Sequence, residues 1–242
     1  MIEWTDLPLL GGVALFSAFL GSVAGSGGST VLLPVLVLYF GIRDAVFIIT
    51  IANLAANLSR VVFNRQEIVF PVVGWFVLGS FPASIAGAWL FTVTPPEVMT
   101  RGLGVLLISL VLWRRIRPSP KVGFPVRRFV VLGGAFGLLE GVLGSVGPLM
   151  APFFLAFGLM RGAYIGTDAL ATVSMQGTKL AVFGSASLMR EDIVVAGLVL
   201  VPFMIAGTLL GKRLLERVSD RFFALLVEAM LILAGLNFLI RA

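Results

Sequence analysis

The sequence has 242 residues, of which 59% are hydrophobic and 12% charged, and its mean hydropathy is +1.07. Soluble domains carry about 25% charged residues, so this composition predicts an all-α polytopic membrane protein. The net charge of +6 fits contact with the lipid bilayer better than nucleic-acid binding. Without Cys or His, thiol nucleophiles, thiolate or imidazole metal sites and histidine proton relays are excluded. We therefore expect no enzyme and no metal site.

A cluster of glycine and hydroxyl residues interrupts the first apolar run. As one helix, residues 8–41 would reach roughly 50 Å at about 1.5 Å per residue, whereas the hydrocarbon core is only about 30 Å thick. The sequence GSGGST at residues 25–30 cannot sustain an ordinary helix, because glycine loses the most backbone entropy and small polar residues favour caps. We predict a helical hairpin, either re-entrant or fully spanning, that turns at Gly25–Gly28, with Ser29 or Thr30 capping the returning helix.

Three further spans are expected in the first half, and the second half repeats the plan. The first three lie at about residues 45–63, 68–91 and 97–113. A basic linker follows at residues 114–128, with six cations and no acid. The second half has a run at 129–157 broken at Gly144–Pro148, then spans at about 162–185, 193–215 and 222–240.

An internal match relates the two halves. Residues 81–87, FPASIAG, align with 201–207, VPFMIAG, and nearly the same offset aligns the two glycine-containing breaks and Arg60 with Lys179. A match over three separate segments indicates duplication. We predict two inverted repeats, residues 1–113 and 129–242, each a broken-helix hairpin plus three transmembrane helices. The positive-inside rule places the linker in the cytoplasm and both termini outside.

The opening of the chain resembles a known family. The GSGGS break, the following Val31-Leu-Leu-Pro34, then Gly41 and a span bearing Thr50 and Asn53, are similar to the sulfite exporter TauE/SafE family. The resemblance covers nearly the whole chain. It implies a multi-pass protein of the cytoplasmic (inner) membrane that exports or takes up small sulfur-containing anions, driven by an ion gradient and without a prosthetic group. The second break departs from the pattern, since it has fewer glycines than the first.

The candidate substrate site joins both breaks to polar residues of the second span in each half. Backbone N–H groups at half-helix N-termini can hold an oxyanion, although small residues also allow close helix packing. Asn53 and Asn57 are four apart, as are Thr172 and Gln176, so each pair shares a helix face; interhelical hydrogen bonds explain such pairs equally well. The candidates are Gly25, Ser26, Gly27, Gly28, Ser29, Thr30, Asn53, Asn57, Gly144, Ser145, Gly147, Thr172, Gln176 and Lys179.

Ionisable residues within spans cost roughly 2.5–3.5 kcal/mol on insertion scales, so each needs a cavity or a partner. Lys179 is a candidate anion ligand, or else structural. Arg60 lies close to Arg65 and is expected to snorkel to the interface. Glu140 is a proton-coupling candidate, because burial disfavours a charged carboxylate; the alternative is a fixed ion pair with Lys179 or Arg60.

These features predict a secondary transporter, in the export direction, for a small sulfur-containing anion such as sulfite or an organosulfonate. Broken-helix N-termini at the repeat interface would hold the anion. A passive anion channel built from the same repeats is the alternative, and Glu140 favours a transporter, because an anion channel gains nothing from a midplane carboxylate. The expected partners are the anion, the bilayer and a gradient of protons or another ion. The substrate, the transport direction, the coupling ion and any homo-oligomer stay open.

Overall fold

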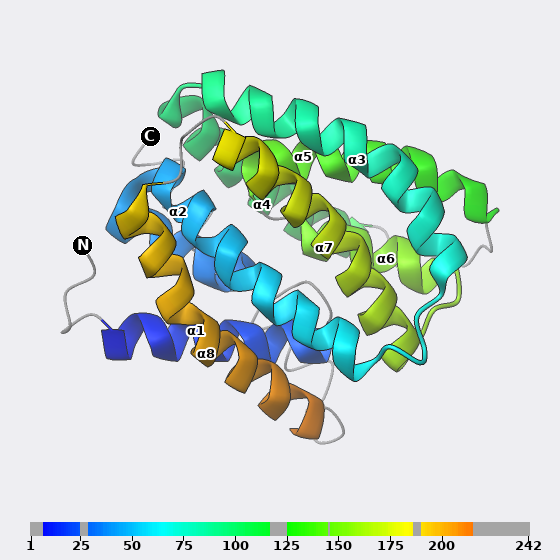
Figure 1. Ribbon diagram of the computed structural model, residues 1–242. Coiled ribbons are helices and arrows are strands. Elements are labelled where there is room, and N and C mark those ends of the chain that lie inside the picture. The colour runs from blue at the N-terminus through cyan, green and yellow to red at the C-terminus, as the bar shows by residue number, and fades with distance from the viewer. Residues whose placement is uncertain (1–6, 25–28, 117–124, 145, 186–189, 215–242) are drawn as a thin grey trace.

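A computed structural model describes residues 7–24, 29–116, 125–144, 146–185 and 190–214, and these residues are helical apart from short connections (Figure 1). The elements are α1 (Leu7–Ala24), α2 (Ser29–Phe63), α3 (Phe70–Val93), α4 (Pro96–Ile116), η2 (Val126–Arg128), α5 (Phe129–Leu143), α6 (Gly147–Ala156), α7 (Arg161–Ser185) and α8 (Glu191–Leu214). The predicted all-α class is confirmed. The predicted turn at Gly25–Gly28 and the last predicted span, 222–240, lie outside the described residues.

Membrane-spanning length and apolarity occur together in three of the described helices. These segments are Val31–Phe63, Phe70–Val93 and Glu191–Arg213. The 25-residue α7 is long enough to cross as well. Its buried face, however, carries polar residues such as Asp168, Gln176 and Lys179. Polar residues within a span usually face a protein interior rather than lipid, so α7 marks the inside of the bundle.

Glycine divides α2 into two helices. Gly41 has φ 75° and ψ 167°, a conformation that L side chains rarely adopt and that glycine tolerates. Just beyond it, Arg43 donates hydrogen bonds to the carbonyl oxygens of Thr92 (3.3 Å) and Thr94 (2.9 Å). These bonds fasten the start of the second part of α2 to the end of α3.

The second break forms as predicted, between α5 and α6. Helix α5 ends at Leu143 and is capped by Gly144, whose φ of 80° is the left-handed conformation of many helix C-termini. The Gly144 N–H donates to the Glu140 carbonyl at 3.0 Å. Helix α6 begins at Gly147. The rings of Phe129 and Phe157 pack edge to face, with their centroids 5.3 Å apart. Since Phe129 starts α5 and Phe157 follows α6, the two helices form a hairpin whose ends lie together.

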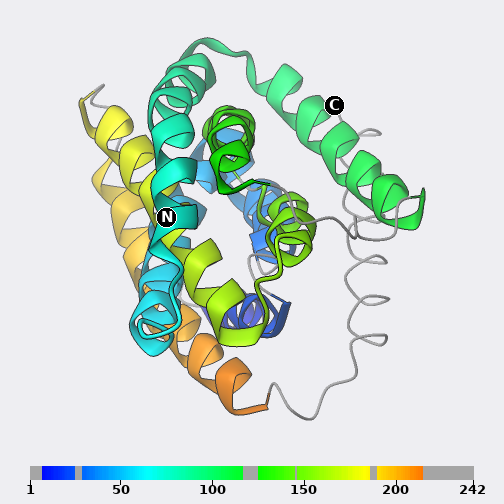
Figure 2. The same cartoon turned by 90° about the vertical axis from the view of Figure 1, so that its right-hand side faces the viewer.

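Two parallel helix pairs, α3 with α5 and α1 with α8, pack backbone to backbone. Gly79 lies against Val130 and Gly87 against Leu138, so α3 and α5 run in the same direction. In the other pair, Gly207 lies against Leu15 and Gly211 against Phe19. Small residues permit such close contacts in membrane helices. Figure 2 shows α4 set apart from the other described helices.

The direction of each pair follows from the contacts at the ends of α2. Lys212, near the end of α8, donates to the Phe63 carbonyl at 3.0 Å, so α2 and α8 end together. Gly166, near the start of α7, lies against Asn64. Helix α3 also starts at this end, after the short connection from α2. Therefore α3, α5 and α7 begin where α2 and α8 end, and α1 runs opposite to α5.

Two apolar cores flank the region where α2 meets α7. One is built mainly by α1, α2 and α8, and it includes the packed rings of Phe47, Phe91 and Phe183. The other is built mainly by α3, α5, α6 and α7 around Phe129 and Phe154. The buried polar residues between these cores are thus separated from lipid.

Gly133→Ala is expected to lower the melting temperature, whereas Gly134→Ala should change it little. A Cβ on Gly133 would lie 2.9 Å from the Phe76 carbonyl carbon and 3.0 Å from the Ser80 nitrogen. Overpacking of this kind costs about 1–3 kcal/mol. The neighbouring Gly134 is the matched control, since the nearest atom to its Cβ would be 3.9 Å away. Equal thermal melting of the two purified variants would contradict close α3–α5 packing.

Candidate functional site

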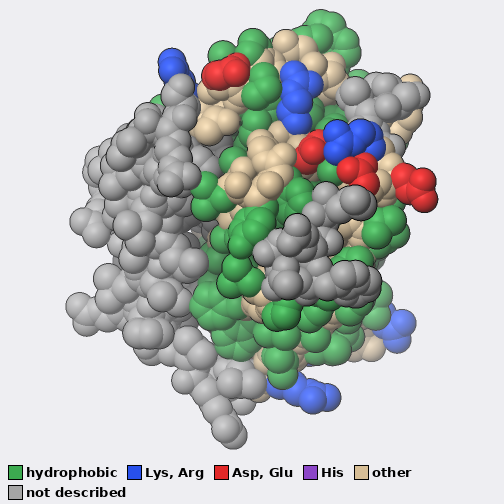
Figure 3. All heavy atoms as spheres, turned by 90° about the vertical axis from the view of Figure 1, so that its left-hand side faces the viewer, with side chains coloured by type: hydrophobic (Ala, Val, Ile, Leu, Met, Phe, Trp, Pro, Cys, Tyr) green, Lys and Arg blue, Asp and Glu red, His purple; other side chains and the backbone are tan. Residues whose placement is uncertain are grey.

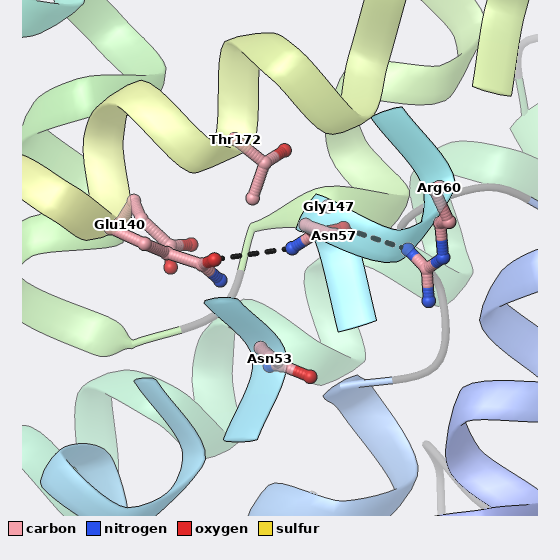
Figure 4. Close-up of a pocket in the computed structure, with 7 residues that line it drawn as sticks. Asn53, Asn57, Arg60, Glu140, Gly147 and Thr172 are labelled. Atoms are coloured by element: carbon pink, nitrogen blue, oxygen red, sulfur yellow. Dashed lines mark hydrogen bonds between the residues drawn. The ribbon is translucent and has the colours of Figure 1, made fainter. Parts of the chain in front are cut away.

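A small polar cavity lies between α2 and α7, beside the break between α5 and α6 (Figure 4). Its volume of about 10 Å³ is near the lower limit for one water molecule. Its lining residues are all buried, and each has a polar side chain or is glycine. They are Asn53, Asn57, Arg60, Glu140, Gly147, Thr172 and Gln176.

Helical periodicity explains why these residues meet. Asn53, Asn57 and Arg60 stand at positions i, i+4 and i+7 of α2, which share one helix face. Thr172 and Gln176 stand at i and i+4 of α7 and line the same cavity, and Figure 4 shows Thr172 on the other side from Asn53 and Asn57. The structure therefore brings together five of the substrate-site candidates, Asn53, Asn57, Gly147, Thr172 and Gln176, with the coupling candidate Glu140.

Hydrogen bonds between side chains connect the two helices through Asn57. Its Nδ2 donates to Gln176 Oε1 at 3.1 Å, and its Oδ1 accepts from Arg60 Nη1 at 2.9 Å (Figure 4). Asn57 is only 4% exposed. A buried amide without a partner costs about 1–3 kcal/mol, so this chain of bonds fixes the rotamers on both sides of the cavity.

Arg60 differs from the sequence-based expectation of snorkelling. Its side chain is buried, with 5% relative exposure, and it lines the cavity. Its Nε has no hydrogen-bond partner, and no carboxylate of the described residues forms a salt bridge with it. Asp168 attracts it through space. The i+7 spacing from Asn53 and the alignment with Lys179 are the sequence signals that place Arg60 inside.

Lys179 is paired with Glu140. Its Nζ lies 3.3 Å from Glu140 Oε1 and 3.4 Å from the Glu140 carbonyl oxygen, and the lysine is fully buried. The other carboxylate oxygen, Oε2, accepts the backbone N–H of Val146 at 2.9 Å. Of the alternatives for Glu140, the structure therefore contains the ion pair with Lys179, and it joins α7 to the α5–α6 break. Lys179 is not among the residues that line the cavity.

The remaining candidates divide between the turn and the undescribed segments. Gly144 forms the left-handed turn, where a Cβ would meet the side chain of Val46. Ser29 and Thr30 open α2. Gly25–Gly28 and Ser145 lie outside the described residues. Within the described helices, no three acidic side chains gather as a metal ion would require.

Long apolar helices around a buried polar site define a multi-pass helical membrane protein. The family model described as "Sulfite exporter TauE/SafE" matches residues 10–238, and the chain belongs to this family. Membership implies membrane transport of anions of the sulfite or organosulfonate type, and the family is one of transporters rather than enzymes. No curated protein and no solved structure matches the chain.

Proposed function

We propose that the protein is a secondary transporter, working in export, of a small sulfur-containing anion such as sulfite or an organosulfonate, with the cavity between α2 and α7 as its substrate site. The observation that carries this proposal is the convergence of a buried arginine and buried amides on one cavity. Gly147, the first residue of α6, also lines it. The N-terminus of that helix carries a partial positive charge, which favours an anion there.

An inverted-repeat architecture is part of the proposal, and the residue pairs across the cavity support it. Asn57 bonds Gln176, which lies 119 residues further along the chain. The same separation relates Asn53 to Thr172, and all four residues line the cavity. The opposite directions of α1 and α5 also fit two repeats, residues 1–113 and 129–242. Transporters of this kind bind substrate at the repeat interface.

The hairpins are proposed to be re-entrant. Helix α6 has ten residues, or about 15 Å at 1.5 Å per residue. This is half of a hydrocarbon core of about 30 Å. A broken helix at that depth is tolerated where its free backbone groups line a protein cavity, as Gly147 does.

The proposed topology places the linker at 114–128 in the cytoplasm and both termini outside. Near the top of Figure 3, acidic side chains gather among Lys and Arg, whereas the coloured charges at the bottom are Lys or Arg. Two cations at the proposed outer end already have partners. Arg190 bonds Asp192 (2.9 Å) and Asp44 (3.4 Å), and Arg43 bonds carbonyl oxygens at the end of α3. The remaining excess of Lys and Arg at the proposed inner end follows the positive-inside rule.

Glu140 stays the candidate for proton coupling within this proposal. A proton on its carboxylate would remove the negative partner of Lys179, and it would alter the acceptor for the Val146 N–H at the break. A pH gradient could thereby act on the helix that borders the substrate cavity.

Purified protein in proteoliposomes is expected to show saturable flux of ³⁵S-labelled sulfite that responds to a pH gradient. Gln176→Leu should lower that flux about tenfold or more, because it leaves the buried Nδ2 of Asn57 without its acceptor. Thr178→Val is the matched control on α7, since this hydroxyl bonds only a carbonyl of its own helix. Flux that is linear in concentration and indifferent to pH would favour the passive channel. Absent flux of sulfite and of organosulfonates would refute the proposal.

A further inference from the structure

A second, larger cavity opens beside the first, at the end of the bundle where α2 and α8 end. Its volume is about 160 Å³, and it lies among α1, α2, α7 and α8. Arg60 lines both cavities, and among the described residues it is the one shared by the two linings. The polar or charged residues that matter for the argument are Ser22, Glu67, Thr208 and Lys212.

Two buried donors in the second cavity have no hydrogen-bond partner among the described residues. They are Nε of Arg60, with 5% relative exposure, and Oγ1 of Thr208, with 1%. Buried polar atoms nearly always have a partner, and each exception calls for an explanation such as a ligand. These two atoms belong to different helices, α2 and α8, but line the same cavity. One small ligand could therefore accept from both.

The comparison of the two halves shows what kind of ligand is missing. The separation of 119 residues between Asn57 and Gln176 also relates Arg60 to Lys179. Glu140, the partner of Lys179, lies the same 119 residues after Gly21, so Gly21 is its counterpart in the first half. Glycine has no carboxylate to offer, so among the described residues the cation of the first half has no salt-bridged carboxylate like that of its equivalent; Asp168 attracts it through space.

We infer that the second cavity is an anion subsite. In it a small oxyanion forms an ion pair with Arg60, as the Glu140 carboxylate does with Lys179. The inference rests on the proposed function and adds a place where the anion binds on its way to the first cavity. A guanidinium presents its donors in a planar fork that suits sulfonate and sulfite oxygens, and the Thr208 hydroxyl supplies a further donor. Because Arg60 lines both cavities, an anion held in the larger one stays beside the same cation when the first cavity, which has room for about one water molecule, widens to admit it.

The other charges around the cavity are consistent with an entrance for anions. Lys212 is exposed and bonds the Phe63 carbonyl, so its positive charge stands at the mouth. Glu67, also exposed, opposes it there. Solvent screens both of these charges, whereas Arg60 is shielded from solvent. Asp168, buried near Arg60, attracts the guanidinium through space, and an anion must compete with it.

The chain contains no cysteine, so a single introduced thiol can report on this cavity. Thr208→Cys in phosphatidylcholine nanodiscs would be labelled with an anionic and with a cationic methanethiosulfonate. We expect the ratio of anionic to cationic labelling rates to exceed that of the exposed Gln66→Cys control at least about fivefold, because the buried guanidinium attracts anions. Methanesulfonate should slow labelling at residue 208. Arg60→Gln should abolish both the charge preference and the protection.

The outcomes separate this inference from its alternatives. Equal labelling ratios at residues 208 and 66 would overturn the inference. If Thr208→Cys folds poorly, Ser22→Cys is a second conservative probe of the same cavity. Protection by phosphatidylglycerol, but not by methanesulfonate, would assign the cavity to a lipid headgroup instead. Saturable sulfite flux without any charge preference at residue 208 would overturn the subsite alone. Charge preference and protection without any flux would overturn the proposed transport alone.

Discussion

Replacing Lys179 with Met is expected to lower the melting temperature sharply. The substitution leaves the Glu140 carboxylate buried without its cation, and breaking a buried pair from one side costs about 3–5 kcal/mol. Glu140→Gln should be destabilising for the same reason. The double variant, Lys179→Met with Glu140→Gln, should recover most of the loss, because it buries no unpaired charge. Its glutamine also keeps an acceptor oxygen for the Val146 N–H.

A double-mutant cycle of melting temperatures measures this coupling. Lys212→Met is the control, since this lysine is exposed and bonds only a backbone carbonyl among the described residues. It should melt close to the wild type. A normal melting temperature for Lys179→Met, together with weaker sulfite binding, would instead support the interpretation of Lys179 as an anion ligand. The cycle thus decides whether Lys179 is a structural partner of Glu140 or an anion ligand.

Much of the helical framework could be predicted because apolar length and glycine or proline breaks are local properties. The expected span at 68–91 is the helix Phe70–Val93, and the expected break at Gly144–Pro148 separates α5 from α6. The pairs Asn53 with Asn57 and Thr172 with Gln176 could also be assigned to helix faces, since their spacing alone sets the face. Both pairs line the cavity.

The two intramembrane cations could not be assigned in this way. Distance from the end of a span suggests that Arg60 reaches the interface, but α1, α7 and α8 close over it and bury it. Likewise, sequence leaves Glu140 with two potential cationic partners, and only the packing of α5 against α7 brings Lys179 within 3.3 Å. These contacts depend on tertiary structure, which composition and periodicity do not encode. Two sequence signals were available: the i+7 spacing of Arg60 from Asn53, and the offset of 119 residues, which aligns Arg60 with Lys179 and Glu140 with Gly21 and so exposes the asymmetry.

That asymmetry predicts an unusual result at Gly21: Gly21→Glu should be more stable than Gly21→Gln. Gly21 is buried in α1 and precedes Ser22, which lines the second cavity. If the cavity holds an anion against Arg60, a carboxylate introduced at this position, 119 residues before Glu140, should form a pair with Arg60. A neutral amide of the same size cannot. The expected difference in melting temperature is at least about 6 °C, since an unpaired buried charge costs 3–5 kcal/mol and each kcal/mol shifts the midpoint by 2–4 °C in a chain of this size.

The same variant should lose transport, because its own carboxylate occupies the place of the anion. Sulfite flux of Gly21→Glu should fall to background, and Arg60→Met added to it should remove the stability advantage over Gly21→Gln. Gly12 in the same helix provides the control, because a Cβ there meets no atom within 4 Å. Gly12→Glu and Gly12→Gln should melt alike. A Gly21→Glu protein less stable than Gly21→Gln would mean that its carboxylate is buried without a cation. Arg60 would then be too far from residue 21 to pair with a carboxylate there. An anion could not then pair with Arg60 in the way that the Glu140 carboxylate pairs with Lys179.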